Sequence, residues 1–170
     1  MKNVCLKCGC VKNEFGSQLS LFYDGKECNH DFVEIDDLLV EAMIVLNRKG
    51  YKTMSCCQGH IYEGCNTGYV SFELPIFIKY KNPEFTHVEP TYSSAIEATP
   101  TVLLPNTIDE LHNNIKNINK SMIIYNSIYK FCSSVLKWAY ELPEFDKEEF
   151  INSKEYKEYV KIMESDNYDL

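Results

Sequence analysis

The chain has 170 residues, of which 45% are hydrophobic and 25% charged, a composition that predicts a folded domain and excludes a disordered or collagen-like chain. It contains no run of 18 apolar residues and no apolar signal-peptide core near its start, so we expect a cytoplasmic protein without membrane association. The formal charge is −8, and only Arg48 among 17 basic residues is an arginine, which argues against duplex nucleic acid as a partner because arginine is the main reader of phosphates and guanines.

Metal-binding residue types gather near the start of the chain. Cys5 and Cys8 form a Cys-x-x-Cys knuckle, and Cys28 and His30 form a second pair. Two thiolates on one tight turn can take two corners of a metal tetrahedron, and a second pair closes the site. We therefore predict a zinc site with the ligands Cys5, Cys8, Cys28 and His30. In the alternative, these are free reduced thiols, but the segment then has little apolar material around which to fold.

The spacing of the second pair leaves one ligand open. A single residue separates Cys28 from His30, fewer than in usual zinc knuckles, and Cys10 is the alternative ligand if His30 cannot reach the metal. Residues 19–23 have the pattern of a strand that would bring the two pairs together. The prediction is thus a zinc ribbon over residues 1–31, with a structural role because four protein ligands leave no position for water or substrate.

The remaining residues, 32–170, are expected to form an α/β domain of the α+β type. Residues 32–36 alternate as a short extended entry, and residues 36–50 have the periodicity of a helix. Asp36 is predicted to cap the start of this helix, and Gly50 is predicted to end it. Apolar residues occupy more than one face, so we expect the helix to be covered on more than one side.

Two β segments follow the helix. They are predicted over residues 51–56 and 69–80, and Pro75 interrupts the second. Residues 81–106 hold four of the six prolines and are expected to form loops and edge strands. The predicted architecture is a small mixed sheet behind the zinc ribbon.

A long helix is expected to pack on this sheet. It begins at a capping box that starts with Thr107 and ends before Pro143. Its apolar stripe, which includes Phe131, Val135 and Trp138, indicates a core face in preference to a cofactor groove, and a homodimer through this helix stays open. The acidic tail, residues 139–170, is expected to form one or two short helices that pack back.

The loop after the first β segment carries reactive groups. Residues 53–61 read Thr-Met-Ser-Cys-Cys-Gln-Gly-His-Ile and include a hydroxyl, two thiols and an imidazole. Ligands bind at the carboxyl ends of strands in α/β folds. We therefore predict that this loop binds a small polar or nucleotide-like ligand. The predicted ligand-binding residues are Ser55, Cys57, Gly59 and His60.

Three alternatives remain for the same loop. Cys57 can be a nucleophile with His60 as its base, but no carboxylate partner for His60 is identifiable, so no catalytic residue is assigned. Alternatively, Cys56 or Cys57 can bind a second metal together with His60 and Cys65, with His87 as a candidate fourth ligand. In the third alternative, the small thiols are simply buried at the end of a strand.

Two resemblances involve this segment. Thr53-x-Ser55-x-Cys57-x-Gly59-x-Ile61 resembles the Thr-x-Ser-Ser-Cys-Ser-Gly-Arg-Ile segment of the wybutosine-synthesising tRNA methyltransferase family, whose fold is α/β. The chain is also similar to small uncharacterised bacterial and phage proteins in which Gly-Tyr-Lys-Thr precedes Cys-x-Gly-His. Both resemblances cover a short part of the chain and imply a functional pocket at the loop. His60 stands where the methyltransferase family has arginine.

We therefore expect a zinc-binding protein that binds a small polar or nucleotide-like ligand at residues 55–65, with sequestration of that ligand as one form of this role. Sixteen lysines against one arginine suggest an AT-rich genome and fit a phage or low-GC bacterial source. One alternative function is an enzyme, methyltransferase-like with S-adenosylmethionine or metal-assisted at a second Cys/His site. Another is a protein-interaction adaptor whose ribbon and acidic tail contact a protein partner.

Overall fold

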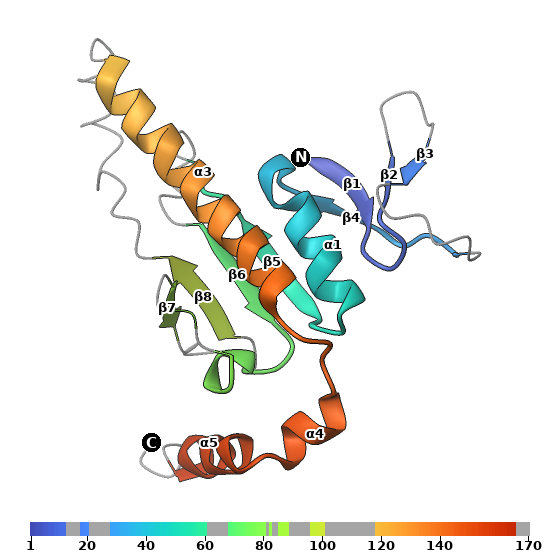
Figure 1. Ribbon diagram of the computed structural model, residues 1–170, viewed down its shortest axis with the longest axis vertical. Helices are drawn as coiled ribbons and strands as arrows, with labels where there is room; N and C mark the ends of the chain where they lie inside the picture. The colour runs from blue at the N-terminus through green and yellow to red at the C-terminus, as the bar shows by residue number, and fades with distance from the viewer. Residues whose placement is uncertain are drawn as a thin grey trace.

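The protein combines two small antiparallel sheets with helices and has a cysteine-rich N-terminus (Figure 1), which confirms the predicted α+β class. The computed structural model describes residues 1–12, 18–20, 28–60, 68–80, 82, 85–88, 96–100 and 118–165. Three predicted features lie wholly or partly outside the described residues. They are the end of the ribbon strand at residues 21–23, the capping box at Thr107 and the thiol of Cys65.

The N-terminal sheet has four strands in the order β3-β2-β1-β4. They are β1 (Lys2–Cys5), β2 (Cys10–Lys12), β3 (Gln18–Ser20) and β4 (Phe32–Ile35). β4 is antiparallel to β1 along its whole length, from Lys2 opposite Ile35 to Cys5 opposite Phe32. The short extended segment expected at residues 32–36 is therefore a strand of the same sheet that carries the first cysteines.

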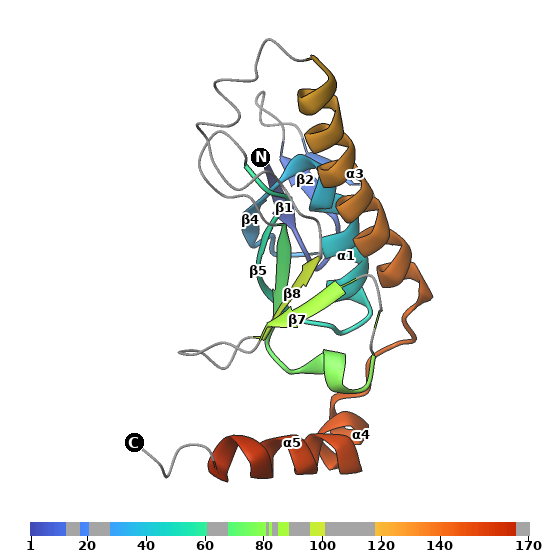
Figure 2. The same cartoon turned by 90° about the vertical axis from the view of Figure 1, so that its left-hand side faces the viewer.

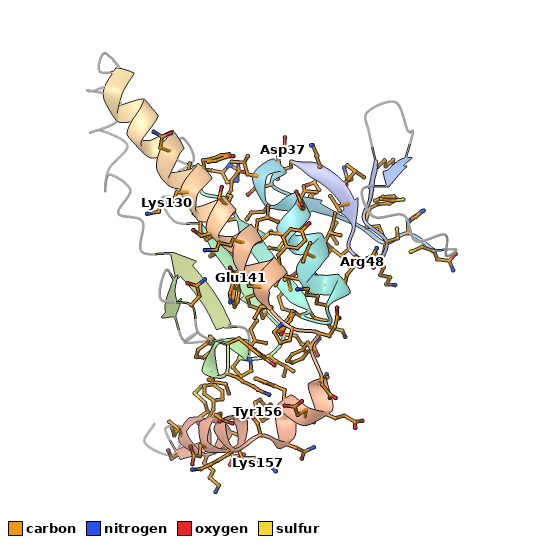
Figure 3. All side chains as sticks on the ribbon, viewed as in Figure 1. Asp37, Arg48, Lys130, Glu141, Tyr156 and Lys157 are labelled. Atoms are coloured by element: carbon orange, nitrogen blue, oxygen red, sulfur yellow. The ribbon has the colours of Figure 1, made fainter. Side chains whose placement is uncertain are left out.

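The first helical segment is central in the core. It consists of a 3-10 turn, η1 (Asp37–Leu39), and the helix α1 (Val40–Arg48), and Figure 3 shows Asp37 and Arg48 at its opposite ends. All six apolar residues from position 40 to position 46 are buried, and Glu41 between them is exposed. The buried residues are Val40, Ala42, Met43, Ile44, Val45 and Leu46. The predicted coverage on more than one side is confirmed, because α1 lies between the N-terminal sheet and α3 (Figure 1).

The second sheet has the strand order β5-β6-β8-β7. Its strands are β5 (Thr53–Cys57), β6 (Tyr69–Phe72), β7 (Phe85–Val88) and β8 (Ile96–Pro100). All the described pairs are antiparallel, so the sheet is not the mixed sheet that was predicted. The reason is that α1 connects two different sheets and does not cross between parallel strands of one sheet. β6 ends at Phe72, and a 3-10 turn, η3 (Ile76–Ile78), follows Pro75.

The long helix α3 (Ile118–Glu141) covers one face of the second sheet together with α1 (Figure 2). Phe131, Val135 and Trp138 are buried, which confirms the predicted core face. The Trp138 ring meets the Phe72 ring edge-on, with their centroids 6.0 Å apart. Cys132 is buried as well, as expected for a small apolar side chain.

The described part of the acidic tail forms two short helices, as predicted. They are α4 (Lys147–Asn152) and α5 (Lys154–Ser165). Phe150 of α4 is fully buried and packs against Phe145, with ring centroids 5.3 Å apart. An ion pair of 2.6 Å between Lys79 Nζ and Glu149 Oε1 links α4 to the turn after η3. The tail thus packs back on the end of the second sheet.

Lys49 joins the end of α1 to the end of α3. Its Nζ donates hydrogen bonds to the carbonyl oxygens of Ala139 and Tyr140, in the last turn of α3, and of Leu142, which follows the last helical residue, Glu141 (Figure 3). These carbonyls have no partner within a helix, and a cation there also interacts favourably with the helix dipole. The link is therefore a charged cap for α3.

We predict that Lys49→Met lowers the free energy of unfolding by about 1–3 kcal/mol, because hydrogen bonds from a charged donor are lost and the carbonyls remain partly buried. The measurement is urea unfolding followed by circular dichroism. Lys137→Met is the matched control, since Lys137 lies on α3 with its side chain 74% exposed. Equal effects of the two substitutions would contradict the capping role.

Candidate functional site

The first candidate site begins at the turn between β1 and β2. Cys5 is the last residue of β1, and the amide of Gly9 donates a hydrogen bond of 2.8 Å to the Cys5 carbonyl. Gly9 has a φ of 75°, a conformation that side chains disfavour. This turn places the Cys8 thiol on the same side as the Cys5 thiol, as the Cys-x-x-Cys spacing predicted.

The pairing of β4 with β1 brings the second pair of residues to this turn. Because Phe32 lies opposite Cys5, Cys28 and His30 arrive beside the first knuckle. The Sγ atoms of Cys5 and Cys28 are 3.8 Å apart, and Cys8 Sγ is 3.2 Å from His30 Nδ1. The four ligand atoms all lie within 4.8 Å of one another. This cluster can hold a metal ion.

The thiols of this cluster differ in acidity. Burial raises the pKa of Cys5, but hydrogen bonds from the Cys8 amide and from His30 outweigh it and lower the pKa to about 6. Desolvation and the neighbouring thiols of Cys5 and Cys8 raise the pKa of Cys28 to about 11. Without a cation, a second thiolate beside that of Cys5 is therefore unfavourable, because the two negative charges repel each other. A divalent ion bound between the thiolates would offset this repulsion.

Cys10, the alternative ligand, is not a member of the four-residue group found in the described part of the chain. It starts β2 and is buried next to the cluster, with 7% of its surface exposed. His30, whose reach was in question, is within the group. The geometry therefore favours His30 over Cys10 as the fourth ligand.

The second candidate site lies at the end of β5. Its centre is the carboxylate of Asp36, which was not predicted to belong to this site. Asp36 Oδ2 is 2.9 Å from His60 Nε2 and accepts a hydrogen bond of 2.9 Å from the Gln58 amide. The Asp36 side chain is 5% exposed, whereas that of His60 is 29% exposed. A buried carboxylate thus holds a partly exposed imidazole in one orientation.

Asp36 stands at the N-cap position of η1 as predicted, but the prediction that its side chain caps the helix is wrong. Its side chain makes no capping hydrogen bond at the start of η1. Gln58 Oε1 instead accepts a hydrogen bond of 3.3 Å from the Leu38 amide. The side chain of Gln58 therefore caps the helical segment, while the backbone amide of the same residue binds the carboxylate that was expected to be the cap.

Cys57 completes this cluster. Its side chain is 8% exposed, and its Sγ accepts a hydrogen bond of 3.3 Å from the amide of Gly59, which has a φ of 98°. One ligand atom from each of Asp36, Cys57 and His60 lies within 4.8 Å of the other two. Cys57 and His60 were predicted from the sequence, but no signal in one sequence connects them to Asp36.

The other predicted loop residues have different surroundings. The Ser55 hydroxyl pairs with the Ser71 hydroxyl at 2.7 Å. Burial and the charge of Asp36 raise the pKa of Cys56 to about 12. The pKa of Cys132, a residue of α3, is raised to about 12 by burial, by the charge of Asp36 and by the thiols of Cys56 and Cys57. Neither thiol belongs to the group of three. Both remain protonated at neutral pH.

His87, the candidate fourth ligand, lies on a distant strand. It belongs to β7, and the order β5-β6-β8-β7 places that strand at the opposite edge of the sheet from β5. Three strand spacings separate the two edges by about 14 Å. The backbone arrangement therefore does not support a shared metal with Cys57.

A separate, partly open pocket lies at the other end of the β5–β6 pair. Its wall includes Tyr51, Glu73, Phe145 and Lys147. The Tyr51 side chain is fully buried, and burial together with Tyr80 raises its pKa. None of the predicted ligand-binding residues is among those that line this pocket.

Comparison of the chain with protein-family models, with curated proteins and with solved structures finds no match. No helix in the described part of the chain is long and apolar enough to cross a membrane. The two clusters of metal-binding residue types are the features of the described residues that bear on function.

We predict that Cys8→Ser abolishes metal binding at the N-terminal cluster, because three ligands remain where four are needed to close the site. The measurement is the metal content of the purified protein by elemental analysis, compared with wild type. Cys10→Ser is the matched control, a buried thiol of the same sheet outside the group. Loss of one metal ion in Cys10→Ser but not in Cys8→Ser would reverse the ligand assignment.

Proposed function

We propose that the protein is a cytoplasmic zinc-binding protein that binds a small polar or nucleotide-like ligand at the loop after β5. In this proposal the N-terminal cluster holds a structural zinc, and the loop over residues 55–65 is the functional site. The two roles follow from the number of ligands at each place: four close the first site, whereas the loop keeps a partly exposed imidazole.

Zinc is the metal that the N-terminal donors favour. Three thiolates and one imidazole are a usual zinc set, and Zn–S bonds of 2.3 Å at tetrahedral angles give a sulfur–sulfur separation of about 3.8 Å. The distance between Cys5 Sγ and Cys28 Sγ is 3.8 Å. The cluster therefore accepts zinc with little rearrangement of these two thiols.

The observation that carries the proposed ligand site is the pair of Asp36 and His60. A buried carboxylate costs free energy unless hydrogen bonds compensate it. Here the compensating groups are the Gln58 amide and an imidazole that is 29% exposed. Core packing does not need such an arrangement, whereas a binding site does, because the carboxylate fixes the tautomer and direction of a histidine that reaches solvent.

The expected ligand is small and polar for two reasons. The amides of Gln58 and Gly59 are occupied by Asp36 and Cys57, so they do not form an open anion cradle, and the imidazole is the main polar group left for a ligand. The scarcity of arginine also argues against a large polyanion. The resemblance of residues 53–61 to a methyltransferase segment supports the same location.

A second candidate function is an enzyme. Asp36 supplies the carboxylate partner of His60 that nucleophilic or metal-assisted chemistry needs. Direct attack by Cys57 is disfavoured, because its sulfur is buried and a substrate atom would have to reach it. Of the enzyme alternatives, metal-assisted chemistry fits the burial better.

We predict that wild-type protein, purified gently from its expression host, carries a small-molecule adduct in native mass spectrometry and that His60→Ala loses it. His87→Ala is the matched control, since β7 lies at the far edge of the sheet. The folded charge-state distribution of each variant shows that the fold is intact. Wild-type protein without an adduct, or an adduct retained by His60→Ala, would contradict the proposed ligand site.

A further inference from the structure

We propose that Asp36, Cys57 and His60 bind a second metal ion, of the zinc type, with one coordination position open to water or to an oxygen donor of a polar ligand. This inference rests on the proposed function, because it names what holds the ligand at the same loop. It also replaces the second metal site suggested by the sequence, in which Cys65 and His87 accompanied the loop residues.

The separation of the donors suits a single ion. One carboxylate oxygen, one thiol sulfur and one imidazole nitrogen all lie within 4.8 Å of one another. Around a tetrahedral zinc, donors of these types are about 3.3–3.6 Å apart, as their usual bond lengths require. Asp36 Oδ2 and His60 Nε2, now 2.9 Å apart, need to separate by only a few tenths of an ångström.

The donors come from two segments that lie in different sheets of the fold. Asp36 follows the last residue of β4, whereas Cys57 ends β5. Three hydrogen bonds hold the loop against Asp36 and the start of η1: from the Gln58 amide, from the Leu38 amide and across the imidazole. These contacts hold the three donors close together before any ion binds.

Hydrogen bonds around the donors match those that support metal ligands. The Gln58 amide donates to the carboxylate, and the Gly59 amide donates to the sulfur. Groups in the outer shell of a metal site typically orient the ligands in this way and offset part of their charge. A buried carboxylate and a buried thiolate that lie side by side would repel each other strongly. A divalent cation between them attracts both and so offsets this repulsion.

The number of ligands indicates an open site. The described residues offer three donors here, in contrast to the four of the N-terminal cluster. Sites with three protein ligands keep a position for water or substrate, and the metal lowers the pKa of bound water or polarises an oxygen of a ligand. His60, with 29% of its side chain exposed, is the most exposed of the three residues, so we expect such a ligand to enter beside it.

The test is zinc stoichiometry, measured by elemental analysis and native mass spectrometry after reduced protein is equilibrated with zinc and freed of excess metal. Wild type is expected to hold two zinc ions per chain. Cys57→Ser is expected to hold one, as is Asp36→Asn. Cys56→Ser is the matched control and should hold two, since the neighbouring thiol lies outside the group. One zinc ion in the wild type, or two in Cys57→Ser, would overturn the inference.

Cobalt substitution tests the open position by a spectroscopic signal that does not depend on the number of ions bound. Inorganic phosphate is the probe: it should shift the visible absorption of the cobalt-loaded wild type and of Cys56→Ser, because it displaces water from the second site. The closed N-terminal site should not respond, so cobalt-loaded Cys57→Ser should show no shift. An identical response in Cys57→Ser would overturn the inference.

The two proposals fail in different ways. If the wild type holds one zinc ion and still retains its small molecule through His60, the second metal is wrong and the proposed ligand site stands. If the wild type holds two zinc ions with the expected losses but retains no small molecule, the second metal stands and the proposed ligand site is wrong.

Discussion

The buried carboxylate of Asp36 is the interaction on which the arrangement of the loop depends. It stands where β4 ends and the first helical segment begins, so it joins the N-terminal sheet to the core helix. A carboxylate that is 5% exposed must have hydrogen-bond partners, and both come from the segment that follows β5. The need to satisfy one charge therefore fixes the position of a loop more than twenty residues away.

This position also places Asp36 and the N-terminal cluster at opposite ends of the same pair of strands. The N-terminal cluster lies at one end of the β1–β4 pair, where Cys5 is opposite Phe32, and Asp36 follows the other end, where Ile35 is opposite Lys2. A metal that orders the cluster holds β4 against β1 and so fixes the strand that carries Asp36. In the proposed function, the N-terminal site would in this way help to fix the position of the loop that binds Asp36.

The features that the sequence could predict depend on local patterns. The spacing of Cys5 and Cys8 predicts a knuckle. The periodicity of apolar residues predicts the buried faces of α1 and of α3 around Val135, because side chains on one face of a helix recur at fixed intervals. The antiparallel second sheet, the pairing of β4 and the role of Asp36 depend on contacts between distant segments. An aspartate before a helix has an ordinary explanation as a cap, and that explanation hid its actual partners at Gln58 and His60.

The chemistry of the donors separates the roles of the two clusters. Three sulfurs and one nitrogen form a soft, closed set around Cys5, which suits tight and permanent binding of zinc. One oxygen, one sulfur and one nitrogen around Asp36 form a mixed set with fewer ligands and a harder donor, which suits an ion that keeps an exchangeable position. In the proposed function the first site stabilises the sheet and the second meets solvent. Asp36 belongs to the second group and follows β4, the strand that pairs with β1, so it lies between the two sites in the fold.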